Sequence, residues 1–446
     1  MKKTLIILMY LLSPVVLIMA IFMSHISKYS MVSFFIPMVL GVLSYTWILW
    51  QLVLSARPKF IEKHFGLDKM YRLHGVIAII AIGIGIIHKL NYEAIFRDSV
   101  MTKLGEIALV IFISVSMISI IFMWTRVFDK FAILKKVVLW MKKLKVITYE
   151  RLKLVHNFTI VGILMLQVHV LMTSAASHST FVFNIYMGYF LTAIGFYIYH
   201  KSIKAWLLEE HHYTISAIYK ETSDVISLDL EPKTLFALNF KPGQFGYFTF
   251  LSKNIPIEEH PFSISSSPTE KSKLTITVKA LGDFTHHLSN TMVGDEVRVE
   301  GPFGRFSYMN AIQEKSTVFI AGGIGITPLM SMLKHIEILD ENRHVILIWA
   351  VKTKNDFIKY KTFTTLERNM AHFSFIPIVS NDNQWTGRKG RLELDVLKDI
   401  LIETSFLDGN TGYYICGSSN FMKSVLDHLQ TIGIPRKQVY YEKFTV

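Results

Sequence analysis

Cysteine is almost absent from this sequence: its 446 residues include one, Cys416. An intrachain disulfide needs two cysteines, and a zinc or iron–sulfur site built on thiolates needs several. The sequence excludes both, so part of the chain is free to lie in a reducing cytosol. Charged residues are also scarce, at 18%, whereas 51% of the residues are hydrophobic. This composition favours a protein that lies at least partly in a membrane.

The excess of positive charge is confined to one half of the chain. The formal net charge is +13, and the surplus of Lys and Arg lies in the apolar residues 1–209. A nucleic-acid-binding protein would have its basic stripe on a polar domain, whereas cationic loops between apolar runs are typical of membrane proteins. We therefore expect contact with a lipid bilayer and none with nucleic acid. The sequence contains no EF-hand calcium loop, and it does not imply an obligate protein activator.

Six apolar runs are long enough to cross a membrane, which takes about 20 residues. They lie near 4–24, 31–54, 72–90, 105–124, 153–174 and 181–200. The first run lacks a clear small-x-small cleavage site, so we expect a retained helix and not a cleaved signal peptide. If the N-terminus is cytoplasmic, most Lys and Arg of the connecting segments, including the lysine-rich segment 125–153, fall on the cytoplasmic side. We therefore predict a multi-pass protein of the cell (plasma) membrane with both termini in the cytoplasm.

Two of the six runs have histidines near both of their ends. The third contains His74 and His88, and the fifth contains His156 and His169. Both runs cross in the same direction, so His74 and His156 share the inner depth while His88 and His169 share the outer depth. The separations correspond to rises of roughly 20 Å at 1.5 Å per residue.

Two histidines at each of two matched depths predict two stacked bis-histidine haems of the b type, with these four residues as iron ligands. The nearby glycines would leave room for a macrocycle: Gly75, Gly83, Gly85 and Gly162. On a regular helix, two side chains 13 residues apart point in directions that differ by about 140°. The helix of the fifth run therefore needs some distortion if His156 and His169 are to lie on one face. The alternative is that the histidines make ordinary polar contacts between helices.

From about Tyr213 the pattern changes to short alternating strands separated by turn residues, which is typical of an antiparallel barrel. HPFSISSSP (260–268), LTITVKALGDFTHHL (274–288) and GDEVRVEGPFGRF (294–306) follow in that order. Together these segments resemble the flavin-binding barrel of the ferredoxin–NADP reductase family. The resemblance implies FAD as a cofactor, with Phe262 on the isoalloxazine, Ser263 near flavin N5 as a catalytic residue, and His260 near the flavin phosphates. It implies further flavin contacts at Pro261, Lys279, Gly282, Thr285, Gly301 and Gly304.

The segment STVFIAGGIGITPLMSMLKHIEIL (316–339) indicates a strand, a glycine loop and a helix. Thr327 fits an N-cap and Pro328 the first helical turn. The glycines would let the backbone approach the pyrophosphate of a nicotinamide cofactor: Gly322, Gly323 and Gly325.

Later strands, with helical stretches between them, suggest an open α/β sheet. In the reductase family that these motifs resemble, the counterparts of Cys416 and Gly417 border the nicotinamide. An aromatic residue near the C-terminus covers the flavin there, and Phe444 fits that position. The resemblance therefore implies that Cys416 and Phe444 are catalytic candidates. Four cations could meet a 2′-phosphate and favour NADPH over NADH, although charged loops are often only solvated: Lys352, Lys354, Arg388 and Arg391.

The expected fold is a membrane α-helical bundle followed by an antiparallel β-barrel flavin domain and an α/β nucleotide-binding domain, at residues 1–209, 210–310 and 311–446. This order resembles the NADPH oxidase and ferric reductase superfamily, and most closely its bacterial NADPH oxidases. The resemblance implies electron transfer from cytosolic NADPH through FAD and two haems to O2, which forms superoxide outside.

The sequence leaves several alternatives to an oxidase open. The first is a ferric-chelate reductase that uses the same electron path, since short outer loops would leave the outer haem accessible. The others are a haem-less receptor that senses nucleotide and a reductase that serves a protein partner. In an oxidase, an outer cation would attract superoxide, and the candidates are Lys28, Arg97 and His178.

Overall fold

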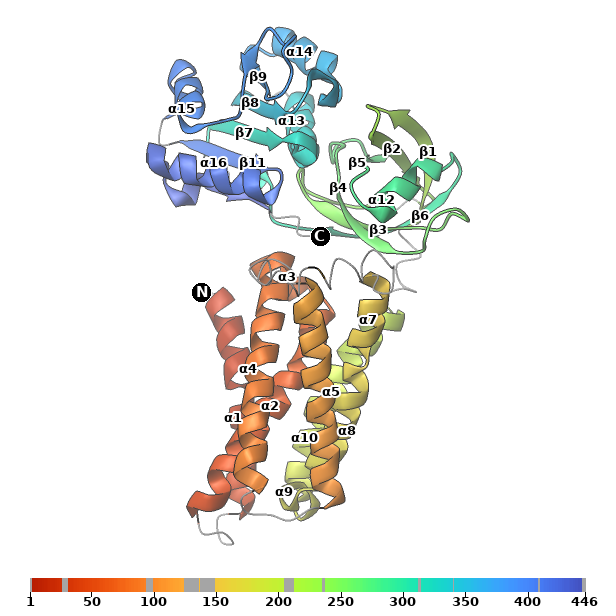
Figure 1. The fold of residues 1–446 in the computed structure, drawn as a ribbon, viewed down its shortest axis with the longest axis vertical. Helices are drawn as coiled ribbons and strands as arrows, with labels where there is room; N and C mark the ends of the chain where they lie inside the picture. Colours follow the sequence, from red (N-terminus) through yellow and green to blue (C-terminus); the bar gives the residue numbers. More distant parts are fainter. Residues whose placement is uncertain are drawn as a thin grey trace. The chain divides into compact units, whose positions relative to one another are not determined.

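The computed structural model describes most of the chain: residues 2–25, 31–93, 99–123, 136, 149–203, 212–234, 237–311, 314–339, 341–407 and 410–442. The chain divides into two compact units, one formed by Met1–Phe65 with Lys69–Ile203 and the other by Gly66–Asp68 with Lys204–Val446. The first unit is helical, and the second contains two sheets with their own helices (Figure 1). The finer boundary expected at residue 310 stays a prediction.

The helices of the first unit run along one another as a bundle (Figure 1). They are α1 (Lys2–His25), α2 (Met31–Ser55), α3 (Lys59–Phe65), α4 (Leu67–Glu93), α5 (Val100–Met123), α7 (Tyr149–Asn157), α8 (Thr159–Leu171), α9 (Ser174–Ser177) and α10 (Thr180–Ile198). Within the described residues, six stretches are long and apolar enough to cross a membrane: Thr4–Ser24, Phe35–Ser55, Leu67–Asn91, Val100–Ile121, Arg151–Leu171 and Thr180–Ile203. The six predicted apolar helices are therefore confirmed.

The fifth span is interrupted, which the sequence pattern did not predict. Helix α7 ends at Asn157 and α8 begins at Thr159. The Thr159 hydroxyl donates a hydrogen bond to the carbonyl of His156 at 2.8 Å, and the amide of Phe158 bonds to Val155 at 3.0 Å. These local bonds compete with the regular helical ladder. The break lies between His156 and His169, in the segment whose 13-residue spacing predicted some distortion.

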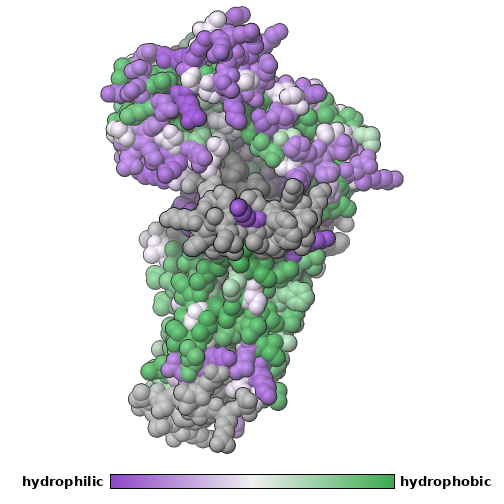
Figure 2. Space-filling model, viewed as in Figure 1, coloured by the Kyte–Doolittle hydropathy of each residue, from purple (hydrophilic) through white to green (hydrophobic). Residues whose placement is uncertain are grey.

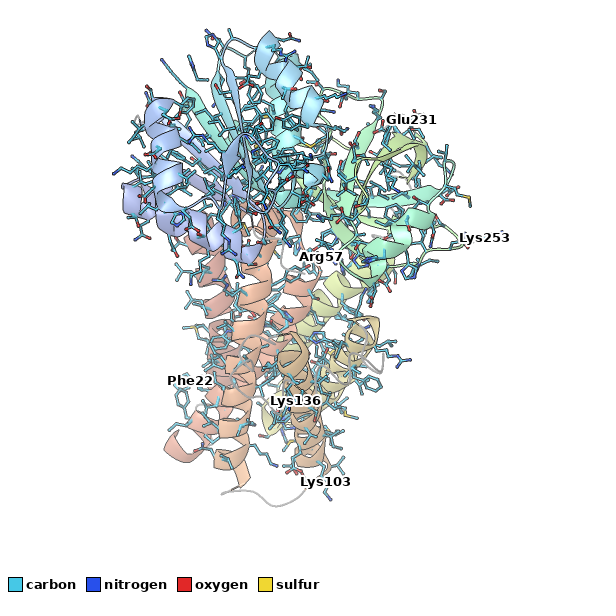
Figure 3. All side chains as sticks on the ribbon, turned by 45° about the horizontal axis from the view of Figure 1, so that its top comes forward. Phe22, Arg57, Lys103, Lys136, Glu231 and Lys253 are labelled. Atoms are coloured by element: carbon cyan, nitrogen blue, oxygen red, sulfur yellow. The ribbon has the colours of Figure 1, made fainter. Side chains whose placement is uncertain are left out.

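The surface of the bundle is apolar between its two ends. Figure 2 shows hydrophobic residues covering most of its visible side. Large apolar side chains point outward from it, including Met9, Leu12, Val16 and Met19, which are 56% to 65% exposed. Water would penalise so much exposed apolar area, whereas lipid tails would not. Arg57 and Lys103 lie at opposite ends of the bundle (Figure 3). The bundle is thus compatible with a membrane protein.

The first sheet of the second unit has six strands, all paired antiparallel. They are β1 (His212–Lys220), β2 (Val225–Pro232), β3 (Phe245–Phe250), β4 (Glu259–Ser263), β5 (Leu274–Lys279) and β6 (Glu296–Phe303), in the order β4-β3-β6-β1-β2-β5. Alternate residues such as Leu228, Leu230, Phe248 and Phe250 fill its core. The antiparallel sheet is confirmed. One bridge, Ile264 to Ile276, joins the end of β4 to β5, and closure into a full barrel stays a prediction.

The second sheet is parallel, as the alternation of strands and helices predicted. Its order is β10-β9-β8-β7-β11-β12, with β7 (Ser316–Gly322), β8 (His344–Val351), β9 (Phe373–Val379), β10 (Arg388–Lys389), β11 (Thr411–Cys416) and β12 (Val439–Tyr441). Helices α13 (Ile326–Ile338) and α14 (Tyr360–Asn369) contribute to the core on one face, and α15 (Leu394–Glu403) and α16 (Ser419–Ile432) to the core on the other. Such open α/β sheets bind ligands beyond the carboxyl ends of their strands.

Candidate functional site: two histidine pairs and a flavin–nucleotide module

The four membrane histidines meet in the two predicted pairs. The imidazole rings of His74 on α4 and His156 on α7 lie 6.0 Å apart between centroids, with their planes at 55°. Those of His88 on α4 and His169 on α8 lie 6.5 Å apart, at 77°. The two pairs therefore occupy two levels along α4, roughly 21 Å apart by the rise of a helix.

The spacing within each pair can be compared with what one iron between two imidazoles needs. A metal–imidazole bond is about 2.0 to 2.1 Å and the ring centre lies about 1.2 Å beyond the nitrogen, so the two centroids stand about 6.4 Å apart. The measured 6.0 and 6.5 Å agree with this value. Within the described ranges, no group of three or more His, Cys, Asp or Glu residues could hold a bare metal ion. The ring separations therefore fit two imidazoles on one iron, and the haems stay a prediction.

The glycines near the histidines fall into two groups. A Cβ added to Gly75 or Gly83 would meet nothing within 4 Å, which agrees with room for a macrocycle. A Cβ on Gly85 would lie 2.9 Å from the Ser44 hydroxyl, and one on Gly162 would lie 2.8 Å from Phe112. These last two glycines allow helices to pack closely. The expectation that they make room for a haem is therefore wrong.

The HPFS segment forms strand β4 and pairs with β3, where Gly246 faces Phe262 and Phe245 faces Ser263. Phe262 is half-buried and packs against Phe248 at 6.0 Å, which leaves part of its ring available to a flavin. The neighbouring Pro261 lies in the same strand opposite Tyr247. Successive side chains of a strand point to opposite faces of the sheet, so Phe262 and Ser263 project from opposite faces of β4, and their expected flavin contacts stay predictions.

His260 is held by two neighbours that the motif alone did not reveal. Its ring stacks on Phe284 at 3.7 Å, with an interplanar angle of 20°. Its Nε2 lies 2.9 Å from a carboxylate oxygen of Glu258. The expected role of His260 beside the flavin phosphates stays a prediction.

The GDFTHHL segment forms the short helix α12 (Asp283–His287). The Thr285 hydroxyl accepts hydrogen bonds from the amides of Leu281 and Gly282, both at 2.9 Å, and this fixes the turn ahead of the helix. Lys279, a predicted flavin contact, forms ion pairs with Asp224 at 3.1 Å and Asp356 at 3.6 Å. Its ammonium group therefore links the antiparallel sheet to the α/β domain.

The turn at Gly301–Gly304 ends β6 beside the C-terminal strand. Gly304 has φ of +92°, and a Cβ there would lie 2.8 Å from the carboxylate of Glu442. Residues with a side chain rarely adopt this backbone conformation. Glycine is therefore required both by the positive φ and by the closeness of Glu442. A Cβ on Gly301 would lie 3.4 Å from the Cα of Gly246, which shows how closely β6 and β3 approach.

The glycine loop follows β7 and opens α13, as predicted. Gly323 has φ of +56° and faces open space, so its backbone is accessible to a phosphate group. The helix has Gly325 as its N-cap, after a 3-10 turn over Gly323–Gly325, so the expected Thr327 N-cap is wrong. The 3-10 turn over Gly323–Gly325 leads directly into α13, so the helix begins at Ile326, before Thr327. Pro328 still lies in the first turn, and the Thr327 hydroxyl donates to the carbonyl of Ile324 at 3.2 Å.

The Cys416–Gly417 segment lies directly against the glycine loop, because β11 pairs with β7. A Cβ on Gly325 would lie 2.4 Å from the carbonyl oxygen of Cys416, and one on Gly417 would lie 3.1 Å from the Cα of Gly322. Because these glycines have no side chains, the loops that follow β7 and β11 come together at the carboxyl ends of the two strands. The structure therefore brings together two motifs that are about 90 residues apart in the sequence.

Cys416 itself is buried, with 1% of its surface exposed. Burial raises the pKa of its thiol, and the nearby Glu442 carboxylate raises it further. The thiol therefore stays neutral near pH 7. Glu442 was not singled out in the sequence because a lone Glu just after a short strand has no recognisable pattern. Phe444 lies outside the described residues.

Strand β12, which precedes Phe444, is anchored by a cluster of polar aromatics. The hydroxyls of Tyr440 and Tyr414 donate to the two carboxylate oxygens of Glu314, at 2.8 and 3.1 Å. The two tyrosine rings stack at 4.8 Å. This cluster fixes the point from which the last residues of the chain depart.

The four cations that could meet a 2′-phosphate lie after β8 (Lys352 and Lys354), in the edge strand β10 (Arg388) and just after it (Arg391). Lys352 and Lys354 are exposed, and Lys354 donates to Gln384 at 3.3 Å. Arg388 forms an ion pair with Glu403, so its charge is engaged. Arg391 is exposed. Of the cations considered for the outer side of the membrane, Lys28 and Arg97 lie outside the described residues and His178 is exposed.

Two family models match the second unit. The FAD-binding domain model matches residues 216–327, and the oxidoreductase NAD-binding domain model matches residues 319–427. These matches indicate a ferredoxin–NADP reductase-like flavoprotein. The matched residues form an electron-transfer reductase module of the kind that binds FAD and NAD(P)H. Both matches lie beyond the helical bundle, so they do not bear on its function.

The sequence is also similar to several bacterial reductases. The reductase component of propane 2-monooxygenase from Rhodococcus jostii is 28% identical over 249 residues, 52% of this chain and 62% of that protein. The electron transfer component of anthranilate 1,2-dioxygenase from Acinetobacter baylyi is 28% identical over 231 residues, 51% of this chain and 64% of that protein. The chain thus matches less than two thirds of the length of these relatives. A ferredoxin NADP+ reductase structure from Neisseria gonorrhoeae, with bound FAD and NADP, aligns over 52% of this chain and 97% of that chain, at 20% identity and a TM-score of 0.45.

Proposed function

We propose that this protein is a transmembrane NADPH oxidase. Electrons from cytosolic NADPH would pass through FAD and two bis-histidine b-type haems to O2 on the outer side, where superoxide forms. The strongest support comes from the two histidine pairs that α4 forms with α7 and α8, whose ring centroids lie 6.0 and 6.5 Å apart. A reductase that acted only in the cytosol would not need them.

Bound FAD accepts the two electrons of a hydride and releases them singly, and haem iron carries one electron at a time. The residues of the chain supply the binding and orientation. Phe262 offers an aromatic face to the flavin ring, and the Ser263 hydroxyl is available to hydrogen-bond near N5. The open backbone at Gly323 and the N-terminus of α13 favour the negative pyrophosphate of the nicotinamide nucleotide.

His74 and His156 would hold the inner haem, and His88 and His169 the outer one. Because two imidazoles would hold each haem, the haems would supply single-electron transfer to O2 and no binding site for it. One NADPH yields NADP+, one proton and two electrons, which reduce two O2 to two superoxide ions. Each electron that leaves a cell with a negative interior is favoured by about 2.3 kcal/mol per 100 mV.

A protein with the same electron path and a ferric chelate as its acceptor is the second candidate. The short turn between α8 and α10 favours it, since α9 there comprises only Ser174–Ser177 and His178 is exposed. This connection would then cover little of the outer haem.

The test is anaerobic reduction of the purified, FAD-supplied protein by NADPH, followed through its haem absorption bands. Oxygen is then admitted together with a probe that superoxide dismutase can inhibit. Haem bands that reduce with NADPH and reoxidise with superoxide release support the oxidase. Haems that stay reduced in oxygen and reoxidise only with chelated iron(III) support the ferric reductase instead. Protein that binds no haem would contradict both.

A further inference from the structure

The second ring nitrogen of His88 is hydrogen-bonded to the backbone of a neighbouring helix. Its Nδ1 lies 2.7 Å from the carbonyl oxygen of Pro37 on α2. One helical turn later, a Cβ on Gly41 would lie 2.9 Å from Cε1 and 3.1 Å from Nδ1 of His88. A helical carbonyl keeps a second lone pair after it accepts its own i+4 amide. The missing side chain of Gly41 therefore gives the imidazole access to that lone pair.

His169 has the same arrangement on a different helix. Its Nδ1 lies 2.8 Å from the carbonyl oxygen of Met101 on α5. Four residues later, a Cβ on Gly105 would lie 2.9 Å from Nδ1 and 3.0 Å from Cε1 of His169. Both outer histidines thus use a carbonyl at position i of a neighbouring helix and a glycine at position i+4.

The inner histidines lack these bonds. The buried Nδ1 of His74 has no hydrogen-bond partner within the part of the chain that the structure describes. The Nδ1 of His156 lies 3.5 Å from the Ser119 hydroxyl, at the far limit for a hydrogen bond. The two levels of the bundle therefore differ in the environment of their histidines, although each level has two imidazoles.

We propose that Gly41 and Gly105 are positioning residues that tune the reduction potential of the outer haem. This inference rests on the proposed function, in which His88 and His169 bind that haem through Nε2. An Nδ1–H that donates to a carbonyl makes the imidazole more basic and fixes its tautomer. A more basic axial ligand stabilises ferric iron more than ferrous iron, and this lowers the potential. The outer iron is thereby a stronger reductant toward its acceptor than it would be without the two bonds.

The test uses Gly41→Ala and Gly105→Ala in the full-length, haem-loaded protein. Each added methyl group must displace the imidazole from its carbonyl. Gly195→Ala is the matched control, because Gly195 lies within α10 and a Cβ there meets nothing within 4 Å. Haem content is measured first. A potentiometric titration of the haem bands without NADPH then gives both midpoint potentials, and loss of one component in His169→Ala identifies the outer haem.

The expected result is a positive shift of the outer midpoint in each glycine variant, with an unchanged inner midpoint and no shift in the control. Full haem content with both midpoints unchanged would overturn the inference and leave the proposed function standing. If the alanine variants lose the outer haem, the titration of the wild-type protein decides instead. A midpoint potential of the outer haem below that of the inner haem supports the inference. An outer midpoint equal to or above the inner midpoint contradicts the inference. Absence of haem from the wild-type protein would instead contradict the proposed function.

Discussion

The imidazole rings of His74 and His156 lie 6.0 Å apart between their centroids, although the two residues belong to different helices far apart in the sequence. Replacement of either with alanine should remove the inner haem and leave the outer one, because each iron depends on its own two ligands. His88→Ala and His169→Ala should do the reverse.

The measurement is the ratio of haem to protein, which should fall by about half in each variant. His178→Ala is the control, since His178 is exposed near the end of the bundle and has no facing imidazole among the described residues. A histidine variant that keeps full haem content would show that the ligand assignment is wrong.

Ser263→Ala should slow the reduction of FAD by NADPH while both haems stay bound. Ser263 lies at the end of β4, opposite Phe245, and it follows the half-buried Phe262. Loss of one transition-state hydrogen bond typically lowers a rate by about 10- to 1,000-fold. Stopped-flow absorbance of the flavin gives this rate directly. Ser263→Thr keeps the hydroxyl and should recover most of the rate. Haem loss from Ser263→Ala would mean that the serine serves the bundle instead.

The thiol of Cys416 should react slowly with iodoacetamide in the folded protein. Its pKa is raised by burial, so the folded state keeps the proton as the pH passes through about 8.5, where an exposed cysteine loses it. Between pH 7 and 9 the folded protein should show little increase in alkylation rate, whereas denatured protein should show a steep one. Because Cys416 is the single cysteine, mass spectrometry reports this site alone. Rapid alkylation of the native protein would contradict the buried position.

Two ion pairs of opposite polarity connect the antiparallel sheet to the α/β domain. Lys279 on β5 pairs with Asp356, and Glu221 after β1 pairs with Lys359, at 3.6 and 3.3 Å. Lys359→Glu places two carboxylates face to face, so hydride transfer should slow and depend more strongly on salt. The folded protein should also lose stability, because the Glu221 side chain is only 10% exposed and would face a second carboxylate.

The double variant Glu221→Lys with Lys359→Glu restores the pair with reversed polarity, and it should recover the rate. Flavin reduction measured across a series of salt concentrations compares the three proteins. Equal rates in all of them would show that this ion pair does not control how the two domains dock.

The apolar runs and the ordered motifs made much of this architecture predictable. Helix length follows from apolar run length, and the parallel sheet follows from the alternation of strands with helices. The pairing of His74 with His156 and of His88 with His169 was predictable from depth alone. The break after Asn157 was not, because it depends on a side-chain hydrogen bond from Thr159 that competes with the helix only locally.

Parts of the site required three-dimensional contacts that no linear pattern contains. Gly85 and Gly162 resemble the glycines that leave room near the histidines, yet Ser44 and Phe112 occupy the space beside them. Gly41 and Gly105 lie in runs without histidines, so only the folded bundle shows that they contact His88 and His169. Glu442 and the Glu314 cluster depend in the same way on strands that the fold brings together.

The most direct test of transmembrane electron transfer uses sealed vesicles that contain the purified, haem-loaded protein. NADPH and FAD are added outside, and cytochrome c is enclosed with or without superoxide dismutase. Molecules whose second unit faces outward should reduce the enclosed cytochrome c, and enclosed dismutase should suppress this reduction. His88→Ala should abolish it while NADPH still reduces the flavin. If only acceptors outside the vesicles are reduced, electrons do not cross the bilayer and the account is wrong.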